Sequence, residues 1–468
     1  MDNNYLLENL LKKVFKKMNK KYVTVIVLVV LISTIYSGCI DEKTPKGPEK
    51  PTTSDIAVFF LTNLSESNYE KAYSFFSDAL QDVLPLDQLP VVWESVINLY
   101  GDMEEILSVQ EKEHDDYILI FLNTTFSNNY FLIFRVVFNQ ENQIEGFYID
   151  SVEPITGYVL PSYVDPDLFT EFDVVIGNEW PLPATLTIPQ GEGPFPAVVL
   201  IHGSGPNDRD ETIGPNKPFK DIAGGLASQG IAVLRYDKRT FAYPNETSSD
   251  PNLTLYTEVI EDAIAAVDFL ISHSSIDKDH IILIGHSLGA MMAPKVALLD
   301  ARVSAIVLLA APACPLEDAI LHQYTYLLLL DGKIDEAEQN FLDELNESIM
   351  KIKTLNISDD EFVLNAPKAY WEYLSTYDPL NTAAALDIPF LILQGMRDYQ
   401  VTYDDDFIMW EKTFMNMTHT TFIAYESLNH LFIAGEGTPT NTEYFLQGNV
   451  AEKVISDIVT WIKNLVGQ

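Results

Sequence analysis

The segment Ile281-Ile282-Leu283-Ile284-Gly285-His286-Ser287-Leu288-Gly289 carries the strongest structural signal in this chain. An apolar run of strand length leads directly into a serine that is flanked at two residues' distance by glycines. This order is typical of a strand that turns sharply into a helix and presents the serine at the bend. The turn forces the serine toward a positive φ, at a cost of about 1–3 kcal/mol, and a Cβ at either glycine would collide with the facing backbone. We therefore expect Ser287 to be an exposed nucleophile.

Two later runs of buried-strand character are each followed by an ionisable side chain. Pro389–Gly395 leads into a loop that contains Asp398, and Thr420–Tyr425 leads into a loop that contains His430. The chain order Ser, Asp, His is that of α/β-hydrolases and differs from the chymotrypsin and subtilisin orders. The sequence thus predicts a catalytic triad in which Ser287 attacks, His430 transfers the proton and Asp398 orients the imidazole.

Acyl transfer through such a triad also requires two N–H donors for the oxyanion of the tetrahedral intermediate. The apolar run Ala197–Ile201 continues into His202-Gly203-Ser204-Gly205, where an oxyanion loop is expected. We predict that the donors are the backbone N–H groups of Leu288, at the start of the next helix, and of Ser204. The choice of Ser204 over Gly203 rests on analogy between loops of this kind.

Other ionisable residues compete for these roles. Asp404, Asp405 and Asp406 are expected to open the following helix, where negative charge favours the N-terminus as a simple cap. His419 precedes its strand and therefore belongs at the opposite edge of the sheet, whereas His430 follows the strand. His286 is expected to point away at the bend and to be structural. His202 is expected to bond to backbone in the oxyanion loop.

The region from residue 151 to 468 predicts an α/β fold with a mostly parallel sheet that is buried on both faces. Near-continuous apolar runs alternate there with helical stripes. A long helical segment rich in aromatic residues, at about 314–377, interrupts the alternation and is expected to form a cap over the nucleophile. The eight expected strands are 174–176, 185–188, 197–201, 231–236, 281–284, 305–309, 390–393 and 421–425.

Residues 54–150 predict a separate small α+β domain. Helical spacing at 56–64, 69–84 and 90–100 gives way to alternating β-branched and aromatic runs at 105–109, 117–124, 130–137 and 144–149. We expect helices on one face of a curved sheet. The domain contains no cluster of catalytic type, so docking, substrate presentation and a purely structural role all remain open.

The N-terminal 39 residues indicate export. Lysines precede an uncharged apolar run at 22–37, which ends in Ser37-Gly38-Cys39. This ending resembles a lipobox, in which a peptidase cleaves before Cys39 and the thiol carries lipid, although Tyr36 departs from the usual leucine. Two outcomes are open, a lipidated Cys39 or an uncleaved signal anchor. In both, the linker at 40–53 tethers the folded part to the outer face of the cytoplasmic membrane.

Composition excludes several classes of function. A formal net charge of −39 argues against a nucleic-acid partner, because phosphate would be repelled. No zinc-ligand, P-loop or dinucleotide fingerprint occurs, so neither a metal nor a nucleotide cofactor is predicted. With Cys39 used as an anchor, Cys314 has no disulfide partner. Glycosylation sequons, which favour surface positions, begin at Asn63, Asn123, Asn245, Asn252, Asn346, Asn356 and Asn416.

The chain resembles the EstD family of α/β-hydrolase carboxylesterases, which is related to the serine aminopeptidase group. The residues that carry the resemblance are Pro183–Pro189, His202–Thr212, Lys217–Asp221 and Leu234–Thr240, with the predicted triad in register. The small domain is similar to one of unknown function that often precedes such hydrolases. The resemblance implies hydrolysis of short to medium acyl esters without a cofactor. The charged run at 208–211 is expected to be an ion-paired loop, with substrate orientation as the alternative.

Three functions remain open from the sequence. The favoured one is an exported, membrane-tethered serine carboxylesterase that acts on a small-molecule ester. A peptidase of the serine aminopeptidase type would use the same triad on small peptides. A binding lipoprotein that carries the triad without turnover belongs to a different class. The oligomeric state is not predicted.

Overall fold

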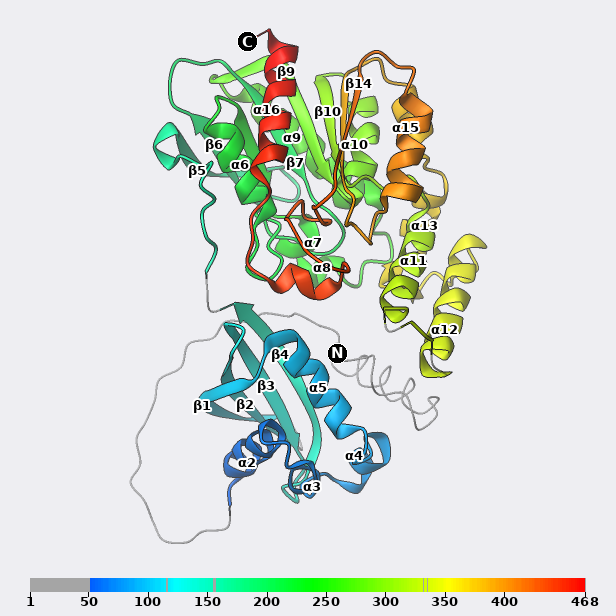
Figure 1. Cartoon of the computed structure of the whole chain (residues 1–468). Coiled ribbons are helices and arrows are strands. Elements are labelled where there is room, and N and C mark those ends of the chain that lie inside the picture. Colours follow the sequence, from blue (N-terminus) through cyan, green and yellow to red (C-terminus); the bar gives the residue numbers. More distant parts are fainter. Residues whose placement is uncertain (1–50, 115–116, 155–156, 331, 335, 468) are drawn as a thin grey trace. The chain divides into compact units, whose positions relative to one another are not determined.

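The computed structural model describes residues 51–114, 117–154, 157–330, 332–334 and 336–467. These residues form two units, divided between Gly157 and Tyr158 (Figure 1). The predicted signal segment, Cys39 and nearly all of the predicted linker lie outside the described residues. Among the residues that are described, no helix has both the length and the apolar character needed to cross a bilayer.

The first unit is the α+β domain that the sequence predicts. Its sheet is an antiparallel meander in the order β1-β2-β3-β4, and burial alternates along β3, so that one face packs on the core. Phe60, Trp93 and Phe134 lie in that core with less than 2% exposure. The elements are α2 (Thr53–Ser65), α3 (Tyr69–Tyr73), α4 (Asp78–Val83), α5 (Leu89–Tyr100), β1 (Met103–His114), β2 (Tyr117–Phe126), β3 (Tyr130–Phe138) and β4 (Ile144–Pro154).

Two details of the first unit differ from expectation. The helical pattern at 69–84 is split, because Phe76 forms a bridge with Ile144 of β4 and the Ser77 hydroxyl accepts the N–H of Leu80 to begin a new helix. Asn63, one of the predicted glycosylation sites, is buried, and its amide donates to the Phe59 carbonyl at 2.7 Å. This side chain is therefore not available at the surface.

The second unit is built on one sheet of eight strands, in the order β14-β13-β10-β9-β7-β8-β6-β5. The first six strands in this order, β14 through β8, are parallel to one another. At the other edge, β6 pairs antiparallel with β8, and β5 pairs antiparallel with β6. Each predicted strand is present, which confirms the fold class. The strands are β5 (Phe169–Ile176), β6 (Leu182–Pro189), β7 (Phe195–Ile201), β8 (Ala232–Tyr236), β9 (Ile276–His286), β10 (Val303–Leu309), β13 (Phe390–Gly395) and β14 (Thr420–Tyr425).

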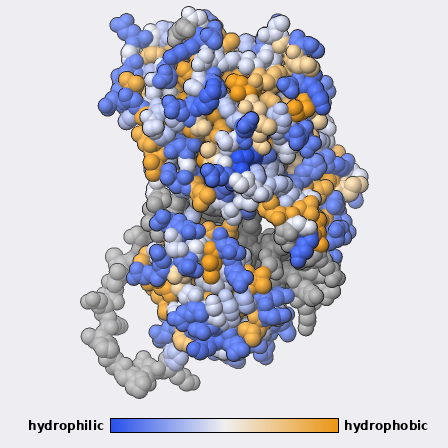
Figure 2. All heavy atoms as spheres, in the orientation of Figure 1, coloured by the Kyte–Doolittle hydropathy of each residue, from blue (hydrophilic) through white to orange (hydrophobic). Residues whose placement is uncertain are grey.

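Helices cover both faces of this sheet, as its continuous apolar strands require. Along β7, Val198 and Leu200 pack toward α6 (Pro218–Ala227) and α16 (Glu452–Val466). Val199 and Ile201 pack toward the opposite layer (Figure 1). That layer comprises α9 (Glu261–Ser272), α10 (Leu288–Leu299) and α15 (Ile408–Phe414). On the face drawn in Figure 2, hydrophilic residues predominate and apolar patches are scattered among them.

The predicted cap region between β10 and β13 is mostly helical. Two of its aromatic side chains, Tyr370 and Trp371, are buried in the core of the second unit, and the Trp371 indole donates to the Val363 carbonyl at 3.0 Å. These residues serve packing. The elements are α11 (Leu316–Leu328), α12 (Glu336–Lys353), β11 (Phe362–Val363), β12 (Ala366–Pro367) and α13 (Lys368–Ser375), followed by α14 (Pro379–Ala384).

The bend from β9 into α10 is as tight as the glycine spacing predicts. A Cβ added at Gly285 would lie 2.4 Å from the carbonyl oxygen of Gly289, and one added at Gly289 would lie 2.1 Å from that of Ile201. The start of α10 therefore touches the end of β7, backbone against backbone. Only glycine allows this approach.

We predict that Gly289→Ala lowers the free energy of unfolding by about 3 kcal/mol, because neither clashing partner is a side chain that can move aside. Gly230→Ala is the matched control. Gly230 has a φ of 91° but open space around it, so its alanine variant pays only backbone strain of about 1–2 kcal/mol. Urea denaturation measures both; equal losses would contradict the contact.

A buried imidazole lies at the carboxyl end of β7. The His202 ring packs against the rings of Phe219 and Tyr236, with centroids 4.9 and 5.2 Å away. Burial, opposed by the Glu211 carboxylate and assisted by Lys238, lowers the pKa of His202 to about 4. The folded protein therefore holds this ring neutral in a pH range where the unfolded chain protonates it.

The sign of the resulting pH dependence follows from the lowered pKa. Above about pH 6.5 the His202 ring is neutral in both states and costs no stability. As the pH falls toward 4, only the unfolded chain takes up the proton, so the free energy of unfolding decreases by up to about 3 kcal/mol. We predict that His202→Gln flattens the fall in unfolding free energy between pH 7 and 4.5, measured by urea denaturation. His322→Gln, at an exposed position, should leave the wild-type slope unchanged. Parallel curves for wild type and His202→Gln would contradict the prediction.

Candidate active site

Ser287 occupies the bend between β9 and α10 with φ of 52° and ψ of −118°. Its backbone N–H donates to the Leu309 carbonyl at the end of β10, at 2.9 Å. The bond fixes the bend to the neighbouring strand. The side chain is partly exposed. The strained, accessible serine that the sequence predicts is therefore present at the carboxyl edge of the sheet.

Asp398 lies in the loop after β13, and its side chain is buried. One carboxylate oxygen accepts the backbone N–H groups of Gln400 and Val401 at 2.8 and 3.0 Å. The other lies 2.7 Å from His430 Nδ1 and 3.2 Å from the donating amide of Gln394. These donors fix the carboxylate toward His430.

His430 lies in a tight loop after β14, and its backbone is held from both sides. The Asn429 side-chain oxygen accepts the N–H groups of Leu431 and Ile433 at 3.0 and 3.2 Å. A Cβ at Gly395 would lie 2.4 Å from the Leu428 carbonyl oxygen, so the end of β13 lies directly against this loop. The loops of the predicted acid and base are therefore packed together.

The loop after β7 lies beside Ser287. A Cβ added at Gly203 would lie 3.3 Å from the Ser287 Cβ. The N–H of Gly203 already donates to the Glu211 carboxylate at 2.7 Å, which leaves it unavailable to a ligand. Ser204 is exposed. Leu288 is the first residue of α10, where an N–H has no intrahelical acceptor.

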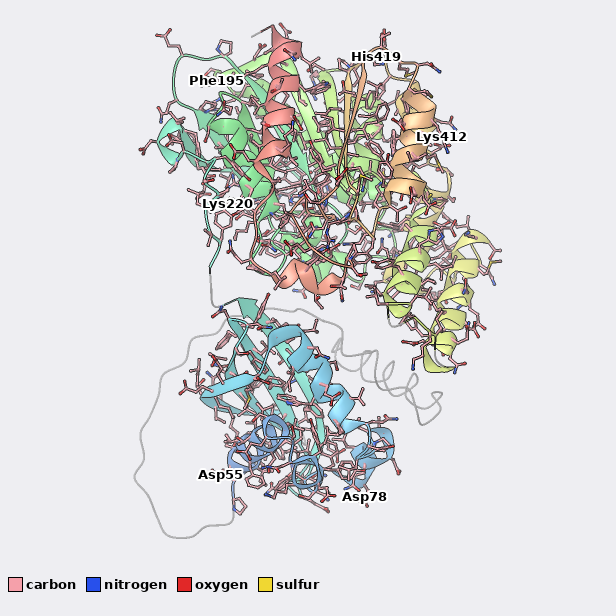
Figure 3. The ribbon with its side chains drawn as sticks, in the orientation of Figure 1. Asp55, Asp78, Phe195, Lys220, Lys412 and His419 are labelled. Atoms are coloured by element: carbon pink, nitrogen blue, oxygen red, sulfur yellow. The ribbon has the colours of Figure 1, made fainter. Side chains whose placement is uncertain are left out.

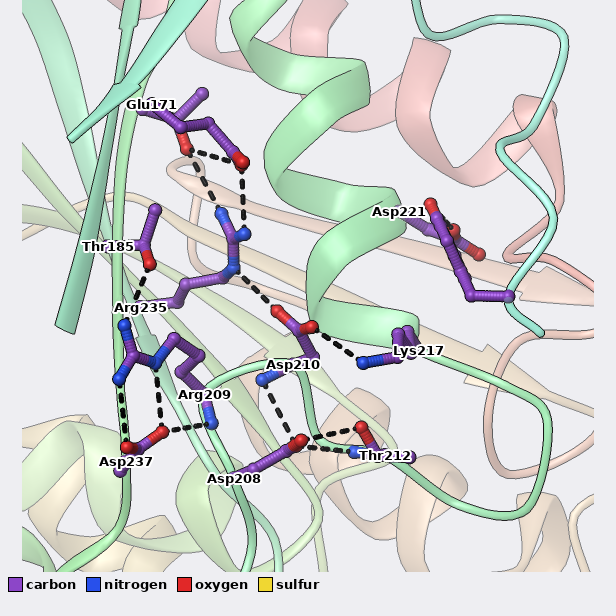
Figure 4. A network of polar contacts seen from close by, with 12 residues as sticks. Glu171, Thr185, Asp208, Arg209, Asp210, Thr212, Lys217, Asp221, Arg235 and Asp237 are labelled. Atoms are coloured by element: carbon purple, nitrogen blue, oxygen red, sulfur yellow. Dashed lines mark hydrogen bonds and ion pairs between the residues drawn. The ribbon is translucent and has the colours of Figure 1, made fainter. Parts of the chain in front are cut away.

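The charged run at 208–211 is ion-paired, as its favoured interpretation expects. Arg209 binds Asp237 at 3.0 Å. Asp210 lies between Arg235, at 2.9 Å, and Lys217, at 3.0 Å (Figure 4). The run thus ties the loop after β7 to β8 and to the start of α6. The ion pairs of this run therefore stabilise the loop after β7.

The competing acids and the competing histidine lie elsewhere. Thr402, and not an aspartate, caps the turn at 403–407. Asp406 is buried, and its carboxylate accepts the N–H groups of Ala313 and Cys314 at 2.8 and 3.1 Å, so it is more than a simple cap. His419 lies at the same end of the unit as Phe195, the first residue of β7 (Figure 3). That edge is opposite to Ser287.

One aromatic side chain of the predicted cap reaches the acid loop. The Tyr326 ring of α11 stacks on that of Tyr399, next to Asp398, with centroids 5.2 Å apart and an interplanar angle of 12°. Its hydroxyl donates to the Pro439 carbonyl at 2.9 Å. The cap is thereby anchored to the loops that hold Asp398 and His430.

Sequence reasoning missed the surroundings of His286. Its Nε2 lies 3.0 Å from the His430 carbonyl oxygen and its Nδ1 lies 3.0 Å from Glu211. The His286 and His430 rings have centroids 4.7 Å apart. No sequence spacing links Glu211 to His286, although Glu211 lies in the charged run at 208–211 and His286 directly precedes Ser287.

Comparison with known proteins agrees with this architecture. Residues 198–433 match the model of the alpha/beta hydrolase family. Residues 57–147 match that of a family described as protein of unknown function, DUF3887. The chain is 34% identical over 140 residues to polyketide transferase af380 of Aspergillus fumigatus, a match that covers 30% of this chain and 42% of that protein.

A relative of nearly full length and one solved structure are also similar. The esterase EstD of Thermotoga maritima is 39% identical over 406 residues, which cover 87% of this chain and 94% of EstD. The structure of Est1E from Butyrivibrio proteoclasticus is 17% identical, covers 63% of this chain and 99% of Est1E, and has a TM-score of 0.42. By its family match and its identity to EstD, the chain belongs to the alpha/beta hydrolase family.

Proposed function

We propose that the protein is a serine carboxylesterase that cleaves a small-molecule ester through Ser287, His430 and Asp398. The observation that carries the proposal is the 2.7 Å contact between His430 Nδ1 and the Asp398 carboxylate, formed between loops at the strand edge where Ser287 adopts a positive φ. The 39% identity to an esterase supports the choice of reaction.

Acylation follows from the roles these groups can take. Because Asp398 engages Nδ1, Nε2 of His430 is the nitrogen left to accept the Ser287 proton. Ser287 Oγ then attacks the ester carbonyl carbon, and His430 returns the proton to the departing alcohol oxygen. The carboxylate holds the tautomer and stabilises the imidazolium that forms between these steps.

We assign the stabilisation of the oxyanion to two hydrogen-bond donors, the backbone N–H groups of Leu288 and Ser204. Gly203 N–H already has an acceptor in Glu211, which favours Ser204 as the second donor. Aligned donors of this kind act on charge that appears only in the transition state, so they accelerate the reaction without tightening substrate binding. Deacylation repeats these steps with a water molecule as the nucleophile, which His430 activates, and releases the acid.

We expect Ser287→Ala to reduce kcat on p-nitrophenyl esters by about six orders of magnitude, because the triad acts as a unit. Asp398→Asn should cost about four orders, since it allows the wrong imidazole tautomer. Steady-state kinetics of the purified proteins measure both. Covalent labelling by a fluorophosphonate should be lost in Ser287→Ala.

The control is Ser204→Ala, which removes a side chain but keeps the proposed N–H donor, and which should retain labelling. Labelling that persists in Ser287→Ala, or a loss of activity below tenfold, would contradict the assignment. A folded wild-type protein that neither turns over esters nor reacts with the probe would identify a binding protein. Faster cleavage of aminoacyl amides than of esters would identify a peptidase.

The proposal includes export and tethering at the outer face of the cytoplasmic membrane. Support comes from the sequence alone, in the lysine-rich start, the apolar run at 22–37 and Cys39 in a lipobox-like ending. Cleavage before Cys39 and lipidation of its thiol would hold the enzyme at the membrane by lipid, and the linker at 40–53 would separate the folded units from the surface.

We predict that cells expressing the full chain incorporate a clickable fatty acid into this protein, and that Cys39→Ser abolishes the incorporation. Cys314→Ser, which removes the other of the two cysteines, is the matched control and should remain labelled. Detection is by gel fluorescence after membrane fractionation. An unlabelled wild-type protein of precursor mass in the membrane fraction would contradict lipidation and identify an uncleaved anchor.

A further inference from the structure

One buried pair of side chains contacts three separate parts of the proposed active site. Glu211 Oε1 accepts the Gly203 N–H at 2.7 Å, in the oxyanion loop. Glu211 Oε2 lies 3.0 Å from His286 Nδ1, and His286 directly precedes the nucleophile. His286 Nε2 lies 3.0 Å from the backbone carbonyl oxygen of His430. Glu211 and His286 therefore join the oxyanion loop, the nucleophile bend and the base loop.

The chemistry of these contacts determines the charge of His286. Both of its ring nitrogens face oxygens that can only accept, a carboxylate of Glu211 and the carbonyl of His430. A neutral imidazole carries one N–H and would set its other lone pair against an oxygen. An imidazolium carries two N–H groups, so that Nε2 can donate to the His430 carbonyl while the positive charge at Nδ1 faces the Glu211 carboxylate.

The contact between Glu211 and His286 is an ion pair whose atoms are close but not aligned as a hydrogen bond. The two side chains are only 2% and 6% exposed. Burial is expensive for a charge unless it is paired, so neither residue is suited to this position as a lone ion. Each makes the charge of the other tolerable.

The surrounding ionisable groups are consistent with this charge state. His286 is faced by Glu211 from the loop after β7, by Asp398 from the loop after β13 and by the His430 ring, and Glu211 is faced also by His202. Burial is the largest single influence and opposes ionisation of both members, but the partner's charge, the neighbouring charges and the backbone contacts together outweigh it. The pKa of Glu211 is therefore lowered and the pKa of His286 is raised.

We propose that Glu211 holds His286 as an imidazolium, and that this pair is the positioning element that aligns the His430 loop and the oxyanion loop with Ser287. The inference rests on the proposed esterase function. Glu211 itself adopts a positive φ of 52°, a conformation that costs a side-chain-bearing residue about 1–2 kcal/mol. Strain of this kind persists where the surrounding contacts enforce it.

Glu211→Gln is the sharpest variant, because it keeps an oxygen for the Gly203 N–H and removes only the charge. We expect kcat on a p-nitrophenyl ester to fall about a hundredfold, the scale of a misplacement near one ångström, with KM within about threefold of wild type. The double variant Glu211→Gln/His286→Gln should lose no more than the larger single loss, because the two residues act as a unit.

Asp300→Asn is the matched control. Its carboxylate is also buried and bound to a cation, Arg302, at 2.7 Å, but it lies before β10 at the opposite edge of the sheet. It should lower the melting temperature while leaving kcat within about twofold of wild type. A Glu211→Gln variant that melts lower but keeps kcat within twofold would overturn the positioning role.

The charge state is tested without any variant that must fold. Nitrogen-15 NMR of the histidine-labelled full chain in detergent, at pH 7, should show both ring nitrogens of His286 protonated. A His286 ring with one unprotonated nitrogen would overturn the proposal. Failure of the proposed esterase function can be distinguished from failure of this inference. In the first case the wild-type protein would neither hydrolyse esters nor react with a fluorophosphonate. The positioning role would then be contradicted, but the protonation of His286 could still be measured by NMR.

Discussion

The backbone contact between the start of α10 and the end of β7 is the constraint on which this site depends. Gly289 lies so close to the Ile201 carbonyl oxygen that a single methyl group would separate the helix from the strand. In the resulting bend Ser287 adopts a φ of 52°, and its N–H donates to the Leu309 carbonyl at the end of β10. The strain is local and small beside the packing of eight strands between two helical layers, which is why the fold tolerates it.

Charge in the second unit is organised to hold loops at the same edge. The chain carries a formal charge of −39, yet the loop after β7 is fixed by cations, with Arg209 on Asp237, Arg235 on Asp210, and Lys238 donating to the Gly203 carbonyl at 2.9 Å. Opposite charges compensate one another at the buried positions. These contacts hold the loop that supplies the proposed oxyanion donor.

Much of the fold and the location of the candidate site follow from local patterns in the sequence. Glycine spacing predicts the bend because it reflects a steric rule, and the positions of Asp398 and His430 after apolar runs place them at one edge because parallel strands end together. The pairing of Glu211 with His286 could not be predicted, since it depends on how two loops fold over each other. The same holds for Phe76, whose bridge to Ile144 interrupts a continuous helical pattern.

A crystal structure of the protein after reaction with a fluorophosphonate would show directly which residue is the nucleophile and which donors bind the oxyanion. We expect phosphorus bonded to Ser287 Oγ, with a phosphoryl oxygen about 2.7–3.1 Å from the N–H groups of both Leu288 and Ser204, and His430 Nε2 within hydrogen-bond reach of Oγ. An adduct on another residue, or a phosphoryl oxygen directed away from the Leu288 N–H, would contradict it.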